Sequence, residues 1–422
     1  MKTILLTCYA VNPYKGSEDG TAWNMLLQIA RHHRVVAITR ENNQADIARY
    51  LAEHRFPGRD NLQFYYFDWP YYLRFWKRKN RGALLYFYLW QASIPGFIRR
   101  RQIAFDLAHN LNFHNDWTPT FLGQLGKPLV WGPVGHHPDY PAEFIRGPYG
   151  WRALWLHRLK WWTKRCFWRY DPFLRRAQNQ AQHVLAINSQ VARRSPRLAT
   201  KVRRLPAVGA NSLPERTVTP LVDFEILSVG RFVPLKGFDL TIRAFAQFYR
   251  GLSAAERGQV QLTLVGKGPE RERLRALARE LSVEAGIKWI EWIEQKDLWD
   301  IYRRAALFCF PSHEGAGMVV PEALAAGLPI LCLDNPGPGE FVDATCGRKV
   351  PYASYETTVA ALAEQLRLLY HDRPLRAQLA LGARQRHATT FTWERKGEIL
   401  RVLYAEMLAA ENSPSKIEIP VG

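Results

Sequence analysis

The feature that most constrains the fold is the stretch 308–341, which reads FCFPSHEGAGMVVPEALAAGLPILCLDNPGPGEF. Its first apolar run ends at Pro311 and predicts a buried strand, and a second run at 328–333 predicts another strand. Between them lie a glycine-bearing loop at 314–318 and Pro321, which suits a first helical turn because its missing N–H would be unpaired there anyway. Strand, loop, helix and strand in this order predict a parallel α/β unit.

Two carboxylates, Glu314 and Glu322, flank the start of this predicted helix. The first backbone N–H groups of a helix have no partner within the helix, so they can bind an anion. Glycines in the preceding loop allow a ligand to approach the backbone closely. The stretch therefore indicates one wall of a site for a polar, negatively charged ligand.

The same alternation of strands and helices runs through both halves of the chain. At 422 residues, the chain exceeds the roughly 250–300 residues at which a single core stops growing. We therefore expect an α/β protein with two Rossmann-like, doubly wound parallel-sheet domains and a cleft between them. The predicted strands are 3–10, 34–39, 62–67, 105–111, 128–131 and 181–189 (taken as the last of the first domain), then 224–229, 261–265, 287–292, 308–311 and 328–333.

A segment rich in Pro, Ser and Asn separates the two series of strands and predicts a linker. The expected organisation is an N-terminal, acceptor-binding domain at 1–205, this linker at 206–222 and a second domain at 223–395. A C-terminal helix at 396–412 is expected to cross back to the first domain.

The chain carries a formal charge of +20, which calls for an anionic partner or surface. Segments 69–101 and 150–176 interleave aromatic residues with Arg and Lys, a pattern typical of helices that lie on a membrane surface. In the alternative interpretation, the aromatic residues form core and the basic residues form a solvated face. Nucleic acid is a third possibility, but no nucleic-acid-binding motif accompanies the charge. We expect an anionic membrane surface as partner, and no nucleic acid.

No run of about 18 apolar residues predicts a transmembrane helix. The apolar N-terminus is interpreted as a first strand rather than a signal peptide. The five cysteines are scattered without a CxxC pair, which favours reduced, structural thiols. We therefore expect a cytoplasmic protein that lies peripherally on the inner face of the cytoplasmic membrane.

Arg231 and Lys236 bracket a loop just after the predicted strand at 224–229. A guanidinium and an ammonium five residues apart suit a diphosphate, although two solvated surface cations would give the same sequence pattern. Four histidines come from the ends of neighbouring predicted strands of the first half, near the carboxyl ends where open α/β sheets bind ligands. They are His109, His114, His136 and His137.

With these residues assembled, the second half resembles the family 4 retaining glycosyltransferases of the GT-B fold, also described as glycosyl transferases group 1. Four motifs carry the resemblance in order: SVGRFVPLKGFDLTIRAF, LVGKGPERERL, LWDIYRRAALFCFPS and HEGAGMVVPEALAAGLPIL. The first half is less similar, although GSEDGTAWN and KPLVWGPVG resemble segments of sugar-transferase acceptor domains.

The resemblance implies a nucleotide-diphosphate sugar as co-substrate, no further cofactor and no metal, and the chain contains no DxD triplet to hold one. It implies transfer with retention to a glycan or lipid-linked acceptor, in cell-envelope glycan synthesis. The implied catalytic residues are Arg231, Lys236, Glu314 and His136, with His109 as the alternative histidine. The implied donor-binding residues are Gly16, Arg231, Lys236, Gly266, Glu314, Gly315, Ala316, Gly317, Met318 and Glu322.

In this assignment, Arg231 and Lys236 neutralise the diphosphate, Glu314 binds sugar hydroxyls and Glu322 accepts both ribose hydroxyls. Three other functions remain open at this point. They are a sugar phosphorylase of the same fold, a nucleotide-sugar epimerase and a non-catalytic protein that binds a membrane surface or nucleic acid.

Overall fold

The computed structural model describes residues 1–77, 82–111, 115–137, 139–213, 221–291 and 293–412. The chain divides into two compact units. The first comprises Met1–His136, Trp162–Ala207 and the chain from Trp393 onwards, and the second comprises His137–Trp161 and Val208–Thr392. Residues 214–220 of the predicted linker, and His114, lie outside the described residues.

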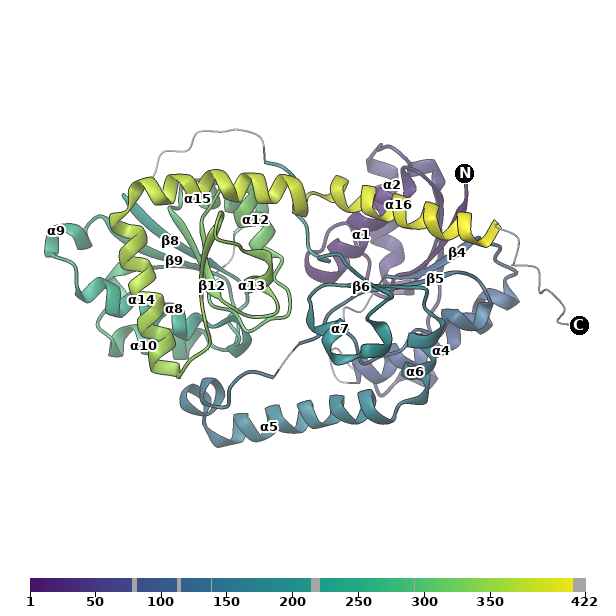
Figure 1. The fold of residues 1–422 in the computed structure, drawn as a ribbon, viewed down its shortest axis with the longest axis horizontal. Helices are drawn as coiled ribbons and strands as arrows, with labels where there is room; N and C mark the ends of the chain where they lie inside the picture. Colours follow the sequence, from purple (N-terminus) through teal and green to yellow (C-terminus); the bar gives the residue numbers. More distant parts are fainter. Residues whose placement is uncertain (78–81, 112–114, 138, 214–220, 292, 413–422) are drawn as a thin grey trace, which may run out of the picture. The chain divides into compact units, whose positions relative to one another are not determined.

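The first unit is built on a seven-stranded sheet whose neighbouring strands are all parallel, in the order β3-β2-β1-β4-β5-β6-β7. Figure 1 labels β4, β5 and β6 of this sheet. Side chains of a strand point alternately to its two faces. Accordingly Ile4 and Leu6 pack in one apolar cluster, whereas Leu5 packs in another. The strands are β1 (Thr3–Thr7), β2 (Arg34–Thr39), β3 (Leu62–Tyr66), β4 (Leu107–Asn110), β5 (Leu129–Val134), β6 (His183–Ala186) and β7 (Val202–Arg204).

Helices cover both faces of this sheet. The cluster around Leu6 includes residues of α1 (Ser17–Ala30) and α16 (Trp393–Asn412), and the cluster around Leu5 includes residues of α4 (Ala83–Arg100). The other helices of this unit are α2 (Gln44–Glu53), α3 (Tyr71–Arg74), α6 (Pro172–Gln180) and α7 (Gln190–Arg194). Helix α16 packs directly on α1, since a Cβ on Gly397 would stand 2.8 Å from the side chain of Gln28.

Helix α5 (Glu143–Tyr170) is shared between the two units. Gly150, at φ 78°, interrupts it, so it consists of two helical stretches. Residues 137–161 belong to the second unit, whereas the predicted boundary placed them in the first domain. Specific contacts account for this: Phe144 joins the apolar core of the second unit, and Arg273 donates a 2.8 Å hydrogen bond to the Tyr149 hydroxyl.

The second unit has a six-stranded parallel sheet in the order β10-β9-β8-β11-β12-β13. The strands are β8 (Phe224–Val229), β9 (Val260–Val265), β10 (Ile287–Ile290), β11 (Leu307–Phe310), β12 (Ile330–Leu333) and β13 (Gly347–Val350). The helices are α8 (Phe238–Arg250), α9 (Ala254–Arg257), α10 (Arg271–Glu280), α11 (Gln295–Arg304), α12 (Val319–Ala325), α13 (Pro338–Phe341), α14 (Tyr355–His371) and α15 (Arg373–Arg386).

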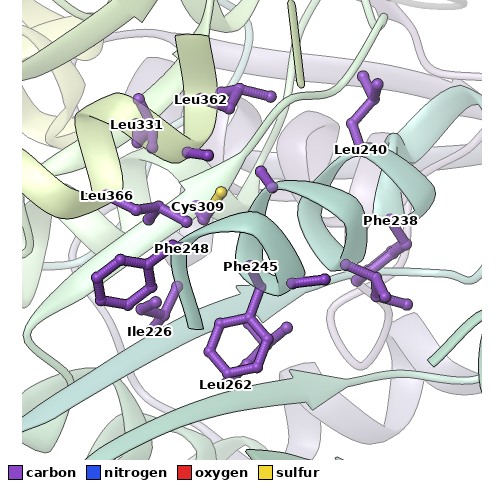
Figure 2. Packing of buried hydrophobic residues seen from close by; sticks show 14 of the residues in the cluster. Ile226, Phe238, Leu240, Phe245, Phe248, Leu262, Cys309, Leu331, Leu362 and Leu366 are labelled. Carbon is purple, nitrogen blue, oxygen red and sulfur yellow. The ribbon is translucent and has the colours of Figure 1, made fainter. Parts of the chain in front are cut away.

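The core of this unit forms where α8 and α14 meet the sheet. Figure 2 shows Phe248 of α8 beside Leu366 of α14 and Ile226 of β8, and Phe245 of α8 beside Leu262 of β9. Each of these side chains is completely buried. Burial of this kind stabilises the unit by about 25 cal/mol for each Å² of apolar surface removed from water. The core thereby holds the loops at the ends of β8 and β11 in fixed positions.

The predicted fold class is confirmed: the chain forms two Rossmann-like parallel α/β units. The prediction that the strand at 181–189 is the last of the first unit is wrong, because β7 follows it. β7 was missed because it has only three residues, two of them arginine. In each sheet the strand order reverses, between β1 and β4 in one and between β8 and β11 in the other. Open parallel sheets bind ligands beyond the carboxyl ends of their strands at such a point.

Candidate active site

The loop after β8 carries the two cations that the sequence analysis singled out. It runs from Gly230 through the exposed Arg231 to a 3₁₀ turn, η5 (Pro234–Lys236), and ends at Gly237. Gly237 has φ 67°, and a Cβ there would stand 2.1 Å from the carbonyl oxygen of Pro311. The position therefore requires glycine both for its backbone conformation and for the close approach of the loop after β11.

Lys236 and Glu314 come together from these two loops. Lys236 Nζ lies 2.8 Å from Glu314 Oε2, and the side chains are only 15% and 19% exposed. The stem of Lys236 passes over Gly230, and its ammonium group lies 5.1 Å from the centre of the Phe310 ring. The sequence indicated both residues as ligand contacts but not that they pair with each other. An ion pair this sheltered from water is weakly screened by salt and holds both side chains in place.

Hydrogen bonds fasten the loop after β11 to the neighbouring loops. Ser312 Oγ donates to the Leu235 carbonyl at 3.1 Å, and the His313 N–H donates to the same oxygen at 2.9 Å. Asn335, just after β12, donates through Nδ2 to the Ser312 carbonyl at 2.6 Å. Ser312 and Asn335 were missed by the sequence analysis. Their positions could have indicated a role in the site, since each lies within two residues of the carboxyl end of a strand.

The glycine-bearing loop is packed tightly against its surroundings. A Cβ on Gly317 would stand 3.1 Å from the Phe310 ring, and one on Gly337 would stand 2.0 Å from the Glu314 carbonyl oxygen. The Gly315 N–H donates a 3.1 Å hydrogen bond to His137 Nδ1. Thus the loop is supported by His137, one of the four histidines noted in the sequence. Ala316 and Met318 lie in the same segment, directly before α12.

His313 holds this loop in place through contacts with Tyr140 and Tyr352. Its ring stacks on Tyr140 at 4.4 Å between centroids and 8° between planes, and its Nδ1 lies 2.6 Å from the Tyr352 hydroxyl. Burial lowers the pKa of His313 to about 3, so the imidazole is neutral at physiological pH. A neutral, stacked and hydrogen-bonded histidine is a rigid support for the adjacent Glu314.

Glu322 lies in the first turns of α12, as predicted, and it also faces Tyr302 of α11. The Tyr302 hydroxyl donates a 3.2 Å hydrogen bond to Glu322 Oε2, and Tyr302 is completely buried. Burial raises the pKa of Glu322 to about 7, against the opposing effects of the Tyr302 hydrogen bond and the positive charge of Lys236. The carboxyl group is thus poised between its charged and neutral forms near neutral pH. Tyr302 was missed because a tyrosine within a helical pattern reads as ordinary core.

Gly266, a predicted donor-binding residue, directly follows β9 and packs against the loop after β8. It has φ 154°, and a Cβ there would stand 1.8 Å from the Gly230 carbonyl oxygen. Gly266 therefore lets the loops after β8 and β9 pack directly on each other. In this way it shapes the backbone next to Arg231.

Gly16 and His136, the two predicted site residues near strand ends of the first half, both belong to the first unit. Gly16 is the N-cap of α1, with open space where its Cβ would be. The His136 Nδ1–H donates to Asp116 Oδ2 at 2.8 Å, with the two side chains 5% and 8% exposed. The His136 ring also lies 5.0 Å from the ring of Trp168. Asp116 was missed by the sequence analysis.

His109, the alternative histidine, has both ring nitrogens engaged. Nε2 lies 2.6 Å from the Gly132 carbonyl, which can only accept, so Nε2 carries the proton. Nδ1 therefore accepts from the Tyr404 hydroxyl at 2.5 Å. Burial lowers the pKa of His109 to about 4, which keeps the ring neutral. These contacts tie α16 to the sheet of the first unit.

In the second unit, the geometry gathers cations and carboxylates where the strand order of the sheet reverses. Arg231 and Lys236 follow β8, and Glu314 follows the adjacent β11. Guanidinium and ammonium groups bind phosphate oxygens, while carboxylates accept hydrogen bonds from hydroxyl groups. The arrangement can therefore bind a ligand that carries both phosphate and hydroxyl groups.

Comparisons with known proteins agree with this chemistry. Residues 212–386 match the family model "Glycosyl transferases group 1". The D-inositol 3-phosphate glycosyltransferase of Acidothermus cellulolyticus is 34% identical over 197 residues, 45% of this chain and 42% of that protein. The lipopolysaccharide core biosynthesis glycosyltransferase LpsE of Rhizobium meliloti is 29% identical over 188 residues, 44% of this chain and 50% of that protein.

Solved structures share the fold over a greater length. HepE of Anabaena, determined in complex with UDP and glucose, superposes with a TM-score of 0.60 at 16% identity, covering 96% of this chain and 100% of HepE. That identity supports the fold alone, and the sequence matches span about half or less of the curated relatives. The match to the glycosyl transferases group 1 model thus lies within the second of two parallel α/β units, whose fold is of the GT-B type.

Proposed function

We propose that the protein is a retaining glycosyltransferase that takes a sugar from a nucleotide-diphosphate sugar without a metal ion. The observation that carries the proposal is the Lys236–Glu314 pair, 2.8 Å apart, where the strand order reverses within the matched domain. The pair offers a cation for the diphosphate and a carboxylate for the sugar within one hydrogen-bond length.

Each residue then has a role that follows from its chemistry. Arg231 and Lys236 stabilise the negative charge that develops on the diphosphate as it leaves. Glu314 accepts hydrogen bonds from hydroxyl groups of the sugar. Glu322 accepts hydrogen bonds from the two ribose hydroxyls, and these favour its charged form and lower its pKa from about 7.

In the proposed reaction, the bond between the anomeric carbon and the diphosphate oxygen breaks, and its electron pair leaves with the nucleoside diphosphate. The acceptor hydroxyl attacks the same face of the sugar, which retains the configuration. Its proton passes to an oxygen of the leaving diphosphate. Because the leaving group takes up the proton, no side chain of the protein has to act as a general base.

We further propose that the acceptor is lipid-linked or belongs to a surface polysaccharide, and that the protein works on an anionic membrane surface. Exposed aromatic residues support the membrane contact: Tyr71 and Tyr72 of α3 are 72% and 71% exposed, and Trp155 of α5 is 63% exposed. Trp151, Trp155 and Trp162 are spaced for one face of α5. Among the described helices, none has the length and apolar character needed to cross a bilayer. The relative LpsE, named for lipopolysaccharide core synthesis, supports an acceptor of the cell envelope.

The proposal is tested in two steps. Thermal shifts measured with UDP-, GDP- and ADP-sugars identify the donor, because a ligand that binds only the folded protein raises its melting temperature. UDP-sugars come first, since HepE binds UDP. The bound donor is then incubated with envelope glycolipid extracts, and NMR of the product gives the anomeric configuration. Transfer with inversion contradicts the proposal, and acceptor-independent epimerisation or phosphate-dependent release of sugar 1-phosphate does so as well.

A further inference from the structure

The first unit contains a basic pocket of about 930 Å³ that the proposed donor site does not use. It is formed by the end of α5, by α6 and α7, and by the 3₁₀ turn η4 (Pro196–Leu198). Six arginines line it: Arg165, Arg169, Arg175, Arg193, Arg194 and Arg197. All of these lining residues belong to the first unit. The volume lies within the range of pockets that bind small molecules.

The positive charge of this pocket is largely uncompensated. Asp116 is the single carboxylate among the described residues that line it. Within the described part of the chain, Arg165, Arg169, Arg175, Arg193 and Arg197 form no ion pair with a carboxylate. The stretch 162–204 carries eleven Lys and Arg residues against one acidic residue, a formal charge of +10 and half of the +20 of the chain. Like charges gathered in this way repel one another unless an anion binds between them.

The pocket also has an ordered inner wall. Arg194 places its guanidinium carbon 3.5 Å from the centre of the Trp168 ring, and the ring of Trp168 in turn lies 5.0 Å from that of His136. His136 is fixed by its 2.8 Å hydrogen bond to Asp116. Stacking of the guanidinium on the indole fixes the plane in which Arg194 presents its N–H donors. At the outer edge, Trp162 and Tyr170 are 63% and 73% exposed.

The donor groups favour phosphate as the ligand. An arginine carries five N–H donors in a planar fork that matches two oxygens of a phosphate group, so several arginines suit a group with many charged oxygens. A diphosphate supplies such a set of oxygens on two adjacent phosphorus atoms. The exposed aromatic rings at the edge offer apolar surface to whatever carries the diphosphate.

We propose that this pocket binds the diphosphate group through which the acceptor is linked to its carrier. The assignment to the acceptor rests on the proposed glycosyltransferase function, whereas the recognition of diphosphate does not. Arg193 and Arg197 are the contacts that the test removes, because both are exposed and line the pocket, whereas Arg194 is stacked on Trp168. The inner wall of Arg194, Trp168 and His136 positions the bound group.

The binding test uses inorganic pyrophosphate and farnesyl diphosphate with the full chain in isothermal titration calorimetry. All variants carry Arg231→Gln and Lys236→Ala, so that the cations of the second unit do not contribute. Adding Arg193→Gln and Arg197→Gln should weaken binding of both probes at least tenfold. The matched control, Arg203→Gln with Arg204→Gln on β7, removes the same charge outside the pocket and should change binding less than twofold. Equal loss in both variants, or loss in neither, overturns the proposal.

Two further arms identify the source of the diphosphate. Vesicles of phosphatidylcholine with 30% phosphatidylglycerol should bind the pocket variant and the control variant equally. If the pocket variant alone loses vesicle binding while its binding of farnesyl diphosphate is unchanged, the pocket is a lipid-headgroup site and the acceptor assignment is overturned. The acceptor assignment is also overturned if the protein binds a single-stranded DNA oligonucleotide more tightly than farnesyl diphosphate. The two proposals can also fail separately. If diphosphate binding depends on Arg193 and Arg197 but no nucleotide sugar raises the melting temperature of the native protein, the pocket proposal stands and the proposed donor chemistry is rejected.

Discussion

Lys236 Nζ lies 2.8 Å from Glu314 Oε2, across the loops that follow the adjacent strands β8 and β11. The pair joins two motifs that are 78 residues apart in the sequence. It also makes the two residues energetically dependent on each other, because removing one leaves a partly buried charge without its partner.

Replacing Lys236 with Ala should lower the rate of sugar transfer by roughly 10²–10³-fold, the usual effect of removing one group that stabilises transition-state charge. Glu314→Gln should reduce transfer as well, with a larger share of the effect on binding of the sugar. The measurement is initial rate against donor concentration. Lys349→Ala is the matched control, because Lys349 forms a 2.9 Å ion pair with Asp334 elsewhere in the same unit. Transfer that survives in Lys236→Ala at the rate of the control contradicts the proposed role.

Glu322 should make stability depend on pH. Its pKa is raised in the folded protein, from 4.5 to about 7, so between these values the folded state binds more protons than the unfolded state. Stability from this group is therefore complete below pH 4.5 and is lost as the pH rises through about 7. Relative to Glu322→Gln, the native protein should lose up to about 3 kcal/mol of unfolding free energy across this window. Urea unfolding of both proteins at pH 4.5 and 8 measures the difference, and parallel pH dependence would show that Glu322 is not perturbed.

Tyr302→Phe removes the hydroxyl that donates to Glu322. The pKa of Glu322 should then rise further, because the lost hydrogen bond favoured the charged form. In the proposed function, the donor binds to that charged form, so the pH at which donor affinity reaches its plateau should move upward. Thermal shift with the donor sugar nucleotide from pH 5 to 9 measures this midpoint. An unchanged midpoint with unchanged affinity would separate Glu322 from donor binding.

The contact between His109 and Tyr404 should hold α16 on the first unit. Tyr404→Phe leaves the buried Nδ1 of His109 without its hydrogen bond, which costs about 1–3 kcal/mol of unfolding free energy. Tyr50→Phe is the control, since the Tyr50 hydroxyl makes no hydrogen bond with the described residues. Urea unfolding followed by circular dichroism gives both values. Equal stability of the two variants would mean that α16 is held by its apolar contacts alone.

Membrane binding should depend on the exposed aromatic residues of α3. The double change Tyr71→Ser and Tyr72→Ser should reduce co-sedimentation with anionic vesicles several-fold, and raising the salt concentration should weaken the remainder. Leu381→Ser serves as the control, because Leu381 is 66% exposed on α15. Vesicle binding that is unaffected by the tyrosine changes would assign the aromatic surface to another contact.

Much of the architecture could be predicted from short stretches of the sequence. The predicted strands at 34–39 and 224–229 agree residue for residue with β2 and β8, because apolar runs of that length are buried in a parallel sheet. The short strand β7 could not be predicted from the sequence, since two of its three residues are arginine and give no apolar pattern.

The candidate donor residues were also visible in the sequence, because cations and carboxylates next to glycines just after strands are a local pattern. Their partners were not. Tyr302 of α11 and Asn335 after β12 reach Glu322 and Ser312 only through the packing of separate elements. Asp116 and His136 are likewise 20 residues apart and meet only at the strand ends of the first sheet.

The sequence by itself determined the two α/β units and the residue types of the donor site, because hydrophobic periodicity and loop chemistry are local properties. The tertiary structure decided which groups pair, as in Lys236 with Glu314 and Tyr302 with Glu322. It also decided which charges gather in one pocket, as those of Arg193 and Arg197 do. Pairing, burial and the resulting pKa of Glu322 depend on distances between elements remote in the chain, and only the packed core sets those distances.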